Sequence, residues 1–365
     1  MRLRPHPRPR INVWRDGADA RNALTVARSA DDGKSWSTPV AVDLQPQTSF
    51  THGDDKEAVT ADPTRPGYVY LVWDRYSNQA PNFKQGSSQN SSKGPAYFSR
   101  STDGGRTWSN KVALYAAENG TIGNQVLVLP NGTLVDLFVN YVVTAASKGA
   151  GVTVNLMEVR STDAGATWTA KPVTVAAMDF VGASDPIGGA YIRGGDGLFS
   201  AAVNPANGNL YATWQDNRFG SVDQVVLTRS TDGGSTWSAP ALVSDTPPSS
   251  NPLYTQAFTP TVAVAANGTV AVTYYDFRNN ATSGPVTDKV DYWAQTSTDG
   301  GQTWGASTRL TASSFPASVA PQAGGLMIGD YEALTSVGGT FAAVFQVDNA
   351  NPSNPTDIQL ATFPG

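Results

Sequence analysis

Acidic side chains recur at similar places along this sequence, which raises the question of acid–base chemistry. Asp55, Asp196 and Asp330 each lie at nearly the same offset before an alternating apolar run. Glu57 and Glu332 follow two residues after an aspartate, which places them on the same side of an extended chain. Carboxyl groups that converge on one place perturb each other's pKa values, as acid–base catalysis requires. The alternative is that these acids cap strand ends or bind a structural cation.

Arginines recur in a second pattern, each beside an aspartate and each directly after an apolar run. The arginines are Arg15, Arg75, Arg218 and Arg278, and the aspartates are Asp16, Asp74, Asp216 and Asp276. A guanidinium group fits a carboxylate with two parallel hydrogen bonds, so several arginines around one opening would suit an acidic ligand. The alternative is an Arg–Asp pair that repeats as part of the scaffold.

Phe83, Phe180 and Tyr191 lie in longer segments nearby, and aromatic side chains suit sugar rings.

A repeated decapeptide indicates which elements must position these residues. Its five copies are RSADDGKSWS from Arg28, RSTDGGRTWS from Arg100, RSTDAGATWT from Arg160, RSTDGGSTWS from Arg229 and TSTDGGQTWG from Thr296. The aspartates at its fourth position are Asp31, Asp103, Asp163, Asp232 and Asp299, which are 72, 60, 69 and 67 residues apart. Alternating apolar runs precede and follow each copy, so each copy is predicted to be a hairpin loop between two strands.

Each residue type in the decapeptide has a local structural role. The aspartate can accept hydrogen bonds from its own turn, and the glycine supplies a backbone shape that other residues resist. The tryptophan can bury a large apolar area with its N–H paired. We therefore interpret the five aspartates as structural residues rather than catalytic ones.

A period of this length fits a four-stranded antiparallel sheet, and repeated sheets of this kind are typical of a β-propeller. The fold class predicted is all-β, a six-bladed propeller that forms a single domain over residues 1–365. The predicted blades are 11–44, 57–117, 124–177, 199–245, 260–312 and 331–363. The first would lack its inner strand and the last its outer strand. We therefore expect that the sequence starts inside a longer natural chain or at a misassigned start; the alternative is that the N-terminal ten residues fill the gap.

The decapeptide resembles the Asp box of sialidases and other BNR-repeat propellers. The resemblance implies six blades with five Asp boxes, and an active site at the end of the sheets away from those boxes. Sialidases remove terminal sialic acid with an arginine triad, a tyrosine nucleophile activated by a glutamate, and an aspartate acid/base. By this resemblance Asp16 or Asp19 is the nearest candidate for the aspartate and Tyr331 for the tyrosine. Arg193, Arg218 and Arg278 are candidates for the later arginines.

Composition excludes several classes of site and partner. The chain has no cysteine and two histidines, His6 and His52, so thiolate chemistry and multi-histidine metal sites are excluded. The net charge of −5 without blocks of like charge argues against nucleic acid as a partner. No apolar run approaches the roughly 20 residues of a membrane helix, so no membrane insertion is expected. No cofactor or metal is predicted, although a structural cation such as calcium is left open.

These observations predict a sialidase-like glycoside hydrolase that is secreted or on the cell surface and acts on terminal, acidic sugars such as sialic acid. The predicted catalytic residues are Asp16, Asp55, Glu57, Asp330, Tyr331 and Glu332. The predicted substrate-binding residues are Arg15, Arg75, Arg193, Asp196, Arg218 and Arg278. A non-catalytic propeller that binds glycan or protein is the first alternative, and a polysaccharide lyase is the second.

Overall fold

The structure is a computed structural model, and it describes residues 9–15, 22–45, 52–77, 95–115, 120–146, 149–280 and 285–365. Within these residues the regular structure is almost entirely antiparallel β-sheet. The described helices are two single turns of 3-10 helix, η1 (Pro252–Thr255) and η2 (Ala317–Val319). No helix among the described residues is long and apolar enough to cross a membrane. The prediction of an all-β fold is confirmed.

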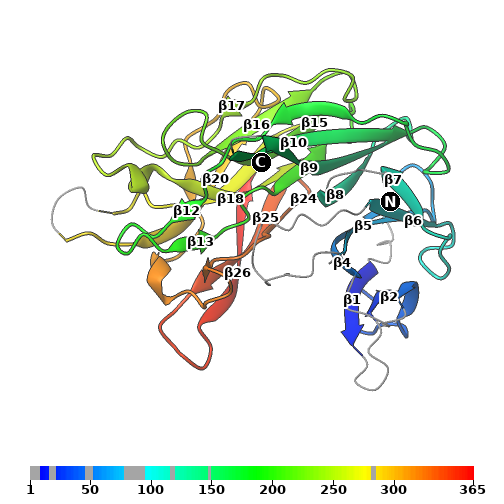
Figure 1. Cartoon of the computed structure of the whole chain (residues 1–365), viewed down its shortest axis with the longest axis horizontal. Helices are drawn as coiled ribbons and strands as arrows, with labels where there is room; N and C mark the ends of the chain where they lie inside the picture. Colours follow the sequence, from blue (N-terminus) through cyan, green and yellow to red (C-terminus); the bar gives the residue numbers. More distant parts are fainter. Residues whose placement is uncertain are drawn as a thin grey trace. The chain divides into compact units, whose positions relative to one another are not determined.

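The chain divides into two compact units, Met1–Val175 and Ala176–Gly365, and each is described by itself. The first unit (Figure 1, blue to green) holds three sheets, whose strands follow in sequence order. The first sheet is β1 (Pro9–Arg15), β2 (Asn22–Arg28) and β3 (Val40–Gln45). The second is β4 (His52–Ala61), β5 (Val69–Ser77), β6 (Ala96–Ser101) and β7 (Val112–Tyr115). The third is β8 (Gly120–Val128), β9 (Leu134–Ala146), β10 (Gly149–Ser161) and β11 (Val173–Ala177).

The second unit (Figure 1, green to red) repeats this arrangement. One sheet is β14 (Phe199–Val203), β15 (Leu210–Asp216), β16 (Gln224–Ser230) and β17 (Ala241–Leu242). The next is β18 (Ala257–Val264), β19 (Val270–Asp276), β20 (Lys289–Ser297) and β21 (Thr308–Arg309), with β22 (Phe315–Pro316) also on β20. The last is β24 (Ala333–Val337), β25 (Thr340–Asp348) and β26 (Thr356–Pro364). A small sheet joins β12 (Ala183–Ser184), β13 (Tyr191–Arg193) and β23 (Leu326–Met327).

The predicted strand order is confirmed, but in three sheets the segment expected to be a loop before the first strand is part of that strand. The pairing of β4 with β5 shifts register between Asp55 and Ala58 and continues to His52. The same shift occurs in β8 and in β18. At each shift one residue has a positive φ: 54° at Lys56, 77° at Gly123 and 50° at Thr259. A bulge of this kind lets a strand continue past an extra residue, which an alternating pattern does not reveal.

The core of each unit consists of apolar side chains packed between neighbouring sheets. In the second unit the Tyr292 ring stacks on Phe345 with centroids 4.5 Å apart and meets Tyr275 at a tilt of 49°, with centroids 4.4 Å apart. All three residues are fully buried. Burying one such side chain contributes about 2–3 kcal/mol to stability, so the sheets hold the loops at their ends in fixed positions.

We use the name repeat loops for the five turns formed by the decapeptide. In the copy at residues 229–238, Asp232 accepts hydrogen bonds from the Ser230 hydroxyl (2.8 Å) and from the backbone N–H (2.9 Å) and hydroxyl (2.7 Å) of Thr236. These hydrogen bonds lower the pKa of Asp232 to about 2, with the Thr236 hydroxyl as the largest cause. The other four copies repeat the contacts between the aspartate, the preceding serine and the Ser or Thr four residues on. The aspartates therefore hold their own turns together, as predicted.

The tryptophans of the repeat loops behave only partly as predicted. Trp108 and Trp168 pack against the core, as expected. Their indole N–H groups, however, are buried without a hydrogen-bond partner. The Trp36 indole donates within its own turn, to the Gly33 carbonyl at 3.2 Å. For Trp108 and Trp168, packing of the ring therefore takes precedence over pairing of the N–H.

Candidate active site

Two segments far apart in the sequence meet in the second unit and bring three predicted residues together. Strand β13 pairs in parallel with β23, so Arg193 lies beside Met327, three residues before Asp330. The Arg193 guanidinium binds Asp330 with two hydrogen bonds, Nε to Oδ1 at 2.9 Å and Nη2 to Oδ2 at 2.6 Å. Its third nitrogen donates to the Ala323 carbonyl at 3.0 Å. These hydrogen bonds hold the guanidinium group in place. The Arg193 side chain is nevertheless 43% exposed, so it reaches solvent.

Asp196, on the loop after β13, has a tyrosine partner that the site prediction omitted. The Tyr191 hydroxyl donates a short hydrogen bond to Asp196. Burial, followed by the contact with Asp196, raises the pKa of Tyr191 above its usual range, so the phenol is neutral at pH 7. A neutral phenol bonded to a carboxylate can pass its proton to that carboxylate when its oxygen attacks an electrophile.

Glycines allow this close packing. Gly195 has a φ of +75°, and a Cβ atom there would lie 2.9 Å from the Asp330 carbonyl oxygen. A Cβ at Gly325 would lie 2.6 Å from the Tyr191 ring, and one at Gly182 would lie 3.1 Å from it. These distances are shorter than side chains tolerate, so the sequence brings the two segments together only where it has no side chain.

The resulting group of five side chains is here called the acid–tyrosine cluster. It consists of Tyr191, Arg193, Asp196 and Asp330, to which we add Tyr331 because it follows Asp330 in the sequence and is exposed. Tyr331 is 52% exposed and Tyr191 is 42% exposed. The sequence signal for Tyr191 was its place in the glycine-rich segment YIRGGD, where it precedes Asp196 by five residues.

Glu332 is adjacent in sequence to this cluster but points into the core. Its Oε1 atom accepts from the Tyr275 hydroxyl at 2.8 Å and from the Gln346 N–H at 3.4 Å. Burial raises the pKa of Glu332 to about 8. Glu332 is therefore mostly a neutral acid at pH 7, and its contacts hold the loop that carries Asp330.

The two later predicted arginines each bind aspartates within the second unit. Arg218 makes two hydrogen bonds of 2.7 Å to the carboxylate of Asp216 and one of 2.6 Å to the Ala177 carbonyl. Arg278 binds Asp276 at 2.5 Å and Asp245 at 2.9 Å. Asp216 and Asp276, each two residues before its arginine, are fully buried, and a buried carboxylate needs such a partner. These contacts match the alternative in which the Arg–Asp pairs belong to the scaffold.

In the first unit, Arg75 has the same kind of environment but with partners that the sequence pattern did not indicate. It binds Asp54 with hydrogen bonds of 2.8 and 3.0 Å, and makes a short contact with Asp43. Lys111 binds the same Asp43 at 2.7 Å. The expected neighbour Asp74 faces the other way and accepts from residues of β8, among them Thr121 at 2.8 Å.

The remaining predicted acids lie apart from Arg75. Asp55 is exposed at the register shift of β4, where its carboxylate accepts from the Lys56 N–H at 2.9 Å. Glu57 is partly exposed on the same strand. Asp16 and the side chain of Arg15 lie outside the described residues, so their predicted roles stay predictions. The described residues contain no group of three or more His, Asp or Glu side chains that could hold a metal ion.

Comparison with solved structures identifies the fold. The Hadza microbial sialidase Hz136 matches 93% of this chain with a TM-score of 0.51 and 18% identity, and this chain spans 59% of its length. The intramolecular trans-sialidase from Ruminococcus gnavus matches 98% of this chain with a TM-score of 0.52 and 12% identity, over 91% of its own chain. The α-L-arabinofuranosidase from Fusarium graminearum matches 98% with a TM-score of 0.50 and 13% identity, over 92% of its own chain. No protein-family model and no curated protein matches the sequence. The chain has the sialidase-like propeller fold, as the decapeptide predicted.

Proposed function

We propose that this chain is a secreted, sialidase-like glycoside hydrolase that removes terminal acidic sugars at the acid–tyrosine cluster. In this proposal residues 1–365 form one propeller domain of six blades, and the repeat loops are its Asp boxes. The observation that carries the proposal is the contact of Tyr191 with Asp196 beside the two-point contact of Arg193 with Asp330.

The pair of Tyr191 and Asp196 would supply the nucleophile. As the Tyr191 oxygen attacks the anomeric carbon, its proton moves to Asp196, and the bond to the leaving alcohol breaks. A tyrosine nucleophile is a known exception to the two-carboxylate scheme of glycoside hydrolysis. A neutral tyrosine carries no negative charge toward an acidic sugar, which favours this choice of nucleophile over a carboxylate.

Arg193 would bind the carboxylate of the substrate. Its fork already holds one carboxylate, that of Asp330, in the geometry that a sugar acid would need. A substrate carboxylate that replaces Asp330 on Arg193 leaves Asp330 without its cation, so that Asp330 takes up a proton from solvent and donates it to the leaving alcohol. Water then attacks the anomeric carbon and gives a proton to Asp330, while Asp196 returns the first proton to the Tyr191 oxygen as the sugar leaves. Tyr331, exposed on the same loop, offers an aromatic face to the sugar ring.

The comparisons support a carbohydrate ligand without choosing the reaction. The matched trans-sialidase is in complex with oseltamivir carboxylate, and the matched arabinofuranosidase is in complex with an iminosugar inhibitor. One fold thus carries different glycosidase activities, and the reaction depends on the side chains of the site.

The test is hydrolysis of a panel of aryl glycosides, including an aryl α-sialoside, by the full chain. We expect release of the aryl group from the sialoside, loss of release in Tyr191→Phe, and a smaller loss with raised KM in Tyr331→Phe. Full activity of Tyr191→Phe would exclude Tyr191 as the nucleophile. Loss in Tyr331→Phe alone would move that role to Tyr331, as the sequence predicted.

A non-catalytic glycan-binding propeller is the second candidate, and one observation favours it. Arg75, Arg218 and Arg278 all bind aspartates of the protein itself, so the described part of the site shows no triad arranged for a substrate carboxylate. A glycan array separates the two candidates: binding without turnover of any aryl glycoside selects the binding protein.

A further inference from the structure

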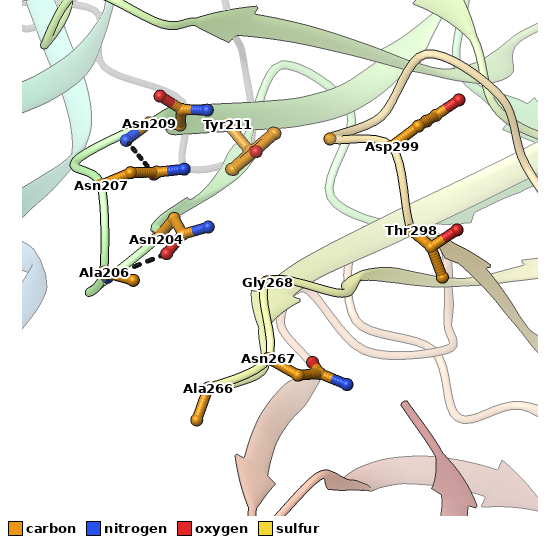
Figure 2. Close-up of a pocket in the computed structure, with 11 residues that line it drawn as sticks. Asn204, Ala206, Asn207, Asn209, Tyr211, Ala266, Asn267, Gly268, Thr298 and Asp299 are labelled. Carbon is orange, nitrogen blue, oxygen red and sulfur yellow. Dashed lines mark hydrogen bonds between the residues drawn. The ribbon is translucent and has the colours of Figure 1, made fainter.

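A pocket of about 360 Å³ lies beside one of the repeat loops in the second unit, away from the acid–tyrosine cluster. It is bounded by the β14–β15 turn, the β18–β19 turn and residues Thr298–Gly300 of a repeat loop. In an antiparallel sheet these turns lie at the end opposite to the β15–β16 and β19–β20 loops. Figure 2 shows Asn204, Asn207 and Asn209 along one wall and Thr298 and Asp299 on the facing wall.

The corresponding place in the first unit is filled. There the β4–β5 turn has the sequence Asp62-Pro-Thr-Arg, and Arg65 and Thr64 cover Gly132 of the β8–β9 turn. A Cβ at Gly132 would lie 3.2 Å from Arg65 Nη2 and 3.4 Å from Thr64 Oγ1. The β14–β15 turn has Asn204-Pro-Ala-Asn instead. The shorter side chains of Ala206 and Asn207 leave open the space that Thr64 and Arg65 occupy in the first unit.

A second substitution changes the hydrogen bonding inside the pocket. In the first unit the Tyr70 hydroxyl donates to Asp62 at 2.6 Å. The equivalent residues in the second unit are Tyr211 and Asn204. The Asn204 Oδ1 atom accepts from the Ala206 N–H at 2.9 Å, so its other arm is an N–H₂ group, which cannot accept from Tyr211. The Tyr211 hydroxyl makes no hydrogen bond with the described residues, and both groups line the pocket.

Two more asparagines of the pocket, Asn207 and Asn267, also use the side-chain oxygen to accept a backbone N–H of their own turn. Asn207 Oδ1 accepts from the Asn209 N–H at 2.9 Å, and Asn267 Oδ1 accepts from the Thr269 N–H at 3.0 Å. Each amide therefore uses its oxygen to hold its own turn, and its N–H₂ group is left for a ligand. In Figure 2 the side-chain nitrogens of Asn204 and Asn207 point away from their turns, toward the facing wall.

The charges of the lining argue against an anionic ligand. None of the described lining residues is a lysine, arginine or histidine, so nothing there neutralises an anion. The single acid, Asp299, uses its carboxylate within the repeat loop, where it accepts from Ser297, Gln302 and Thr303. Several oriented N–H donors and one tyrosine hydroxyl match a ligand rich in hydroxyl oxygens.

We propose that this pocket binds one ring of a neutral carbohydrate, as a site separate from the acid–tyrosine cluster. Its volume is at the lower end of the range for small-molecule sites, which suits one sugar ring rather than a long oligosaccharide. The site goes beyond the proposed hydrolysis and does not depend on it.

The test is saturation-transfer NMR and calorimetric titration of the full chain with the methyl glycosides of galactose, glucose, mannose and N-acetylglucosamine. We expect one of them to bind, and Asn204→Asp to weaken that binding at least tenfold. An aspartate at position 204 keeps the side-chain oxygen that accepts from the Ala206 N–H. It also offers the Tyr211 hydroxyl a carboxylate acceptor, as Asp62 does for Tyr70. This variant is therefore expected to fold with an unchanged or higher Tm. Asn207→Arg fills the pocket as Arg65 does and is expected to abolish binding.

Asn131→Asp is the matched control. Asn131 holds its turn in the first unit through the same contact that Asn267 makes, from Oδ1 to a backbone N–H two residues on, at 3.0 Å. This variant is expected to bind the sugar as the wild type does. The proposal is overturned if no glycoside of the panel binds, if Asn204→Asp and Asn207→Arg bind with unchanged affinity, or if Asn131→Asp loses binding equally. Hydrolysis of the aryl sialoside, measured in parallel, reports on the other site alone.

Discussion

The repeat loops and the acid–tyrosine cluster both depend on aspartates, but the partners of those aspartates differ in range. In the repeat loops each aspartate binds groups within four residues of itself, in every described copy. In the cluster, Asp330 binds Arg193, which is 137 residues away in the sequence. Short-range contacts repeat whenever the motif repeats, whereas long-range contacts exist only where the fold brings two segments together. The repeat-loop aspartates are therefore structural, and the proposed chemistry is assigned to aspartates whose contacts do not repeat.

The largest effect that would test this comparison is on catalysis. Asp196→Asn removes the proton acceptor of Tyr191 and is expected to lower kcat/KM on an aryl sialoside about 100- to 10,000-fold. Asp232→Asn makes the same chemical change in a repeat loop and is expected to leave kcat nearly unchanged. Equal losses in the two variants would contradict the division between structural and catalytic aspartates.

The second effect is on how stability depends on pH. The dependence has opposite signs for the buried acids, whose pKa is raised, and for the repeat-loop aspartates, whose pKa is lowered. Burial raises the pKa of Glu332 to about 8 and that of Asp74 to about 7 in the folded chain. A raised pKa stabilises the fold at pH values below the unfolded pKa, near 4, and this contribution is lost as the pH rises through the folded pKa. The repeat-loop aspartate Asp232 has its pKa lowered to about 2, so its contribution is present above pH 4 and is lost as the pH falls toward 2.

Urea unfolding at pH 5 and pH 9 measures this effect. We expect the free energy of unfolding to fall between these pH values, by at most about 1.4 kcal/mol per pH unit for each such group. Glu332→Gln mimics the neutral acid and is expected to reduce the fall. A wild type that is equally stable at both pH values would show that Glu332 is not held neutral by its burial.

The third effect concerns the glycines that bring the cluster together. Gly195→Ala combines a positive φ with a contact of 2.9 Å to the Asp330 backbone. It is expected to lower stability by about 2–3 kcal/mol and to reduce activity by displacing Asp330. Gly324→Ala has a similar φ of +82° but open space around the new Cβ, so it is expected to cost about 1 kcal/mol with little change in activity. Thermal unfolding and kcat distinguish the two, and equal behaviour would argue against the close approach.

The smallest expected effect is in the repeat loops themselves. Thr236→Val removes the hydroxyl that donates to Asp232 at 2.7 Å, and Thr107→Val removes the same contact to Asp103. Each variant is expected to lower the Tm by about 1–3 °C without changing kcat. Clearly different shifts would show that the copies are not equivalent.

The sequence predicted the fold well because the repeated decapeptide and its flanking apolar runs mark the strands of successive sheets. The decapeptide and its alternating flanks predicted the antiparallel sheets, including the three-stranded ones β1–β2–β3 and β24–β25–β26. They missed the small sheet β12–β13–β23 and the extension of β4, β8 and β18 past their bulges, since an extra residue shifts the alternation that a strand prediction relies on. The predicted site residues Arg193, Asp196 and Asp330 lie near one another in the structure, and the prediction left out Tyr191. The order in which residues follow one another does not show which side chains a parallel pair such as β13 and β23 will bring together.

The sequence by itself determined the repeat loops, because a carboxylate, a glycine and a hydroxyl within four residues form their hydrogen bonds wherever two strands flank them. Only the tertiary structure decided which arginine faces which acid. Asp216 and Asp276 are fully buried and take Arg218 and Arg278 as partners, because a carboxylate removed from water needs a cation or several donors. Asp330 binds Arg193, which is 137 residues away in the sequence, because two glycine-rich segments pack so closely that no side chain fits between them.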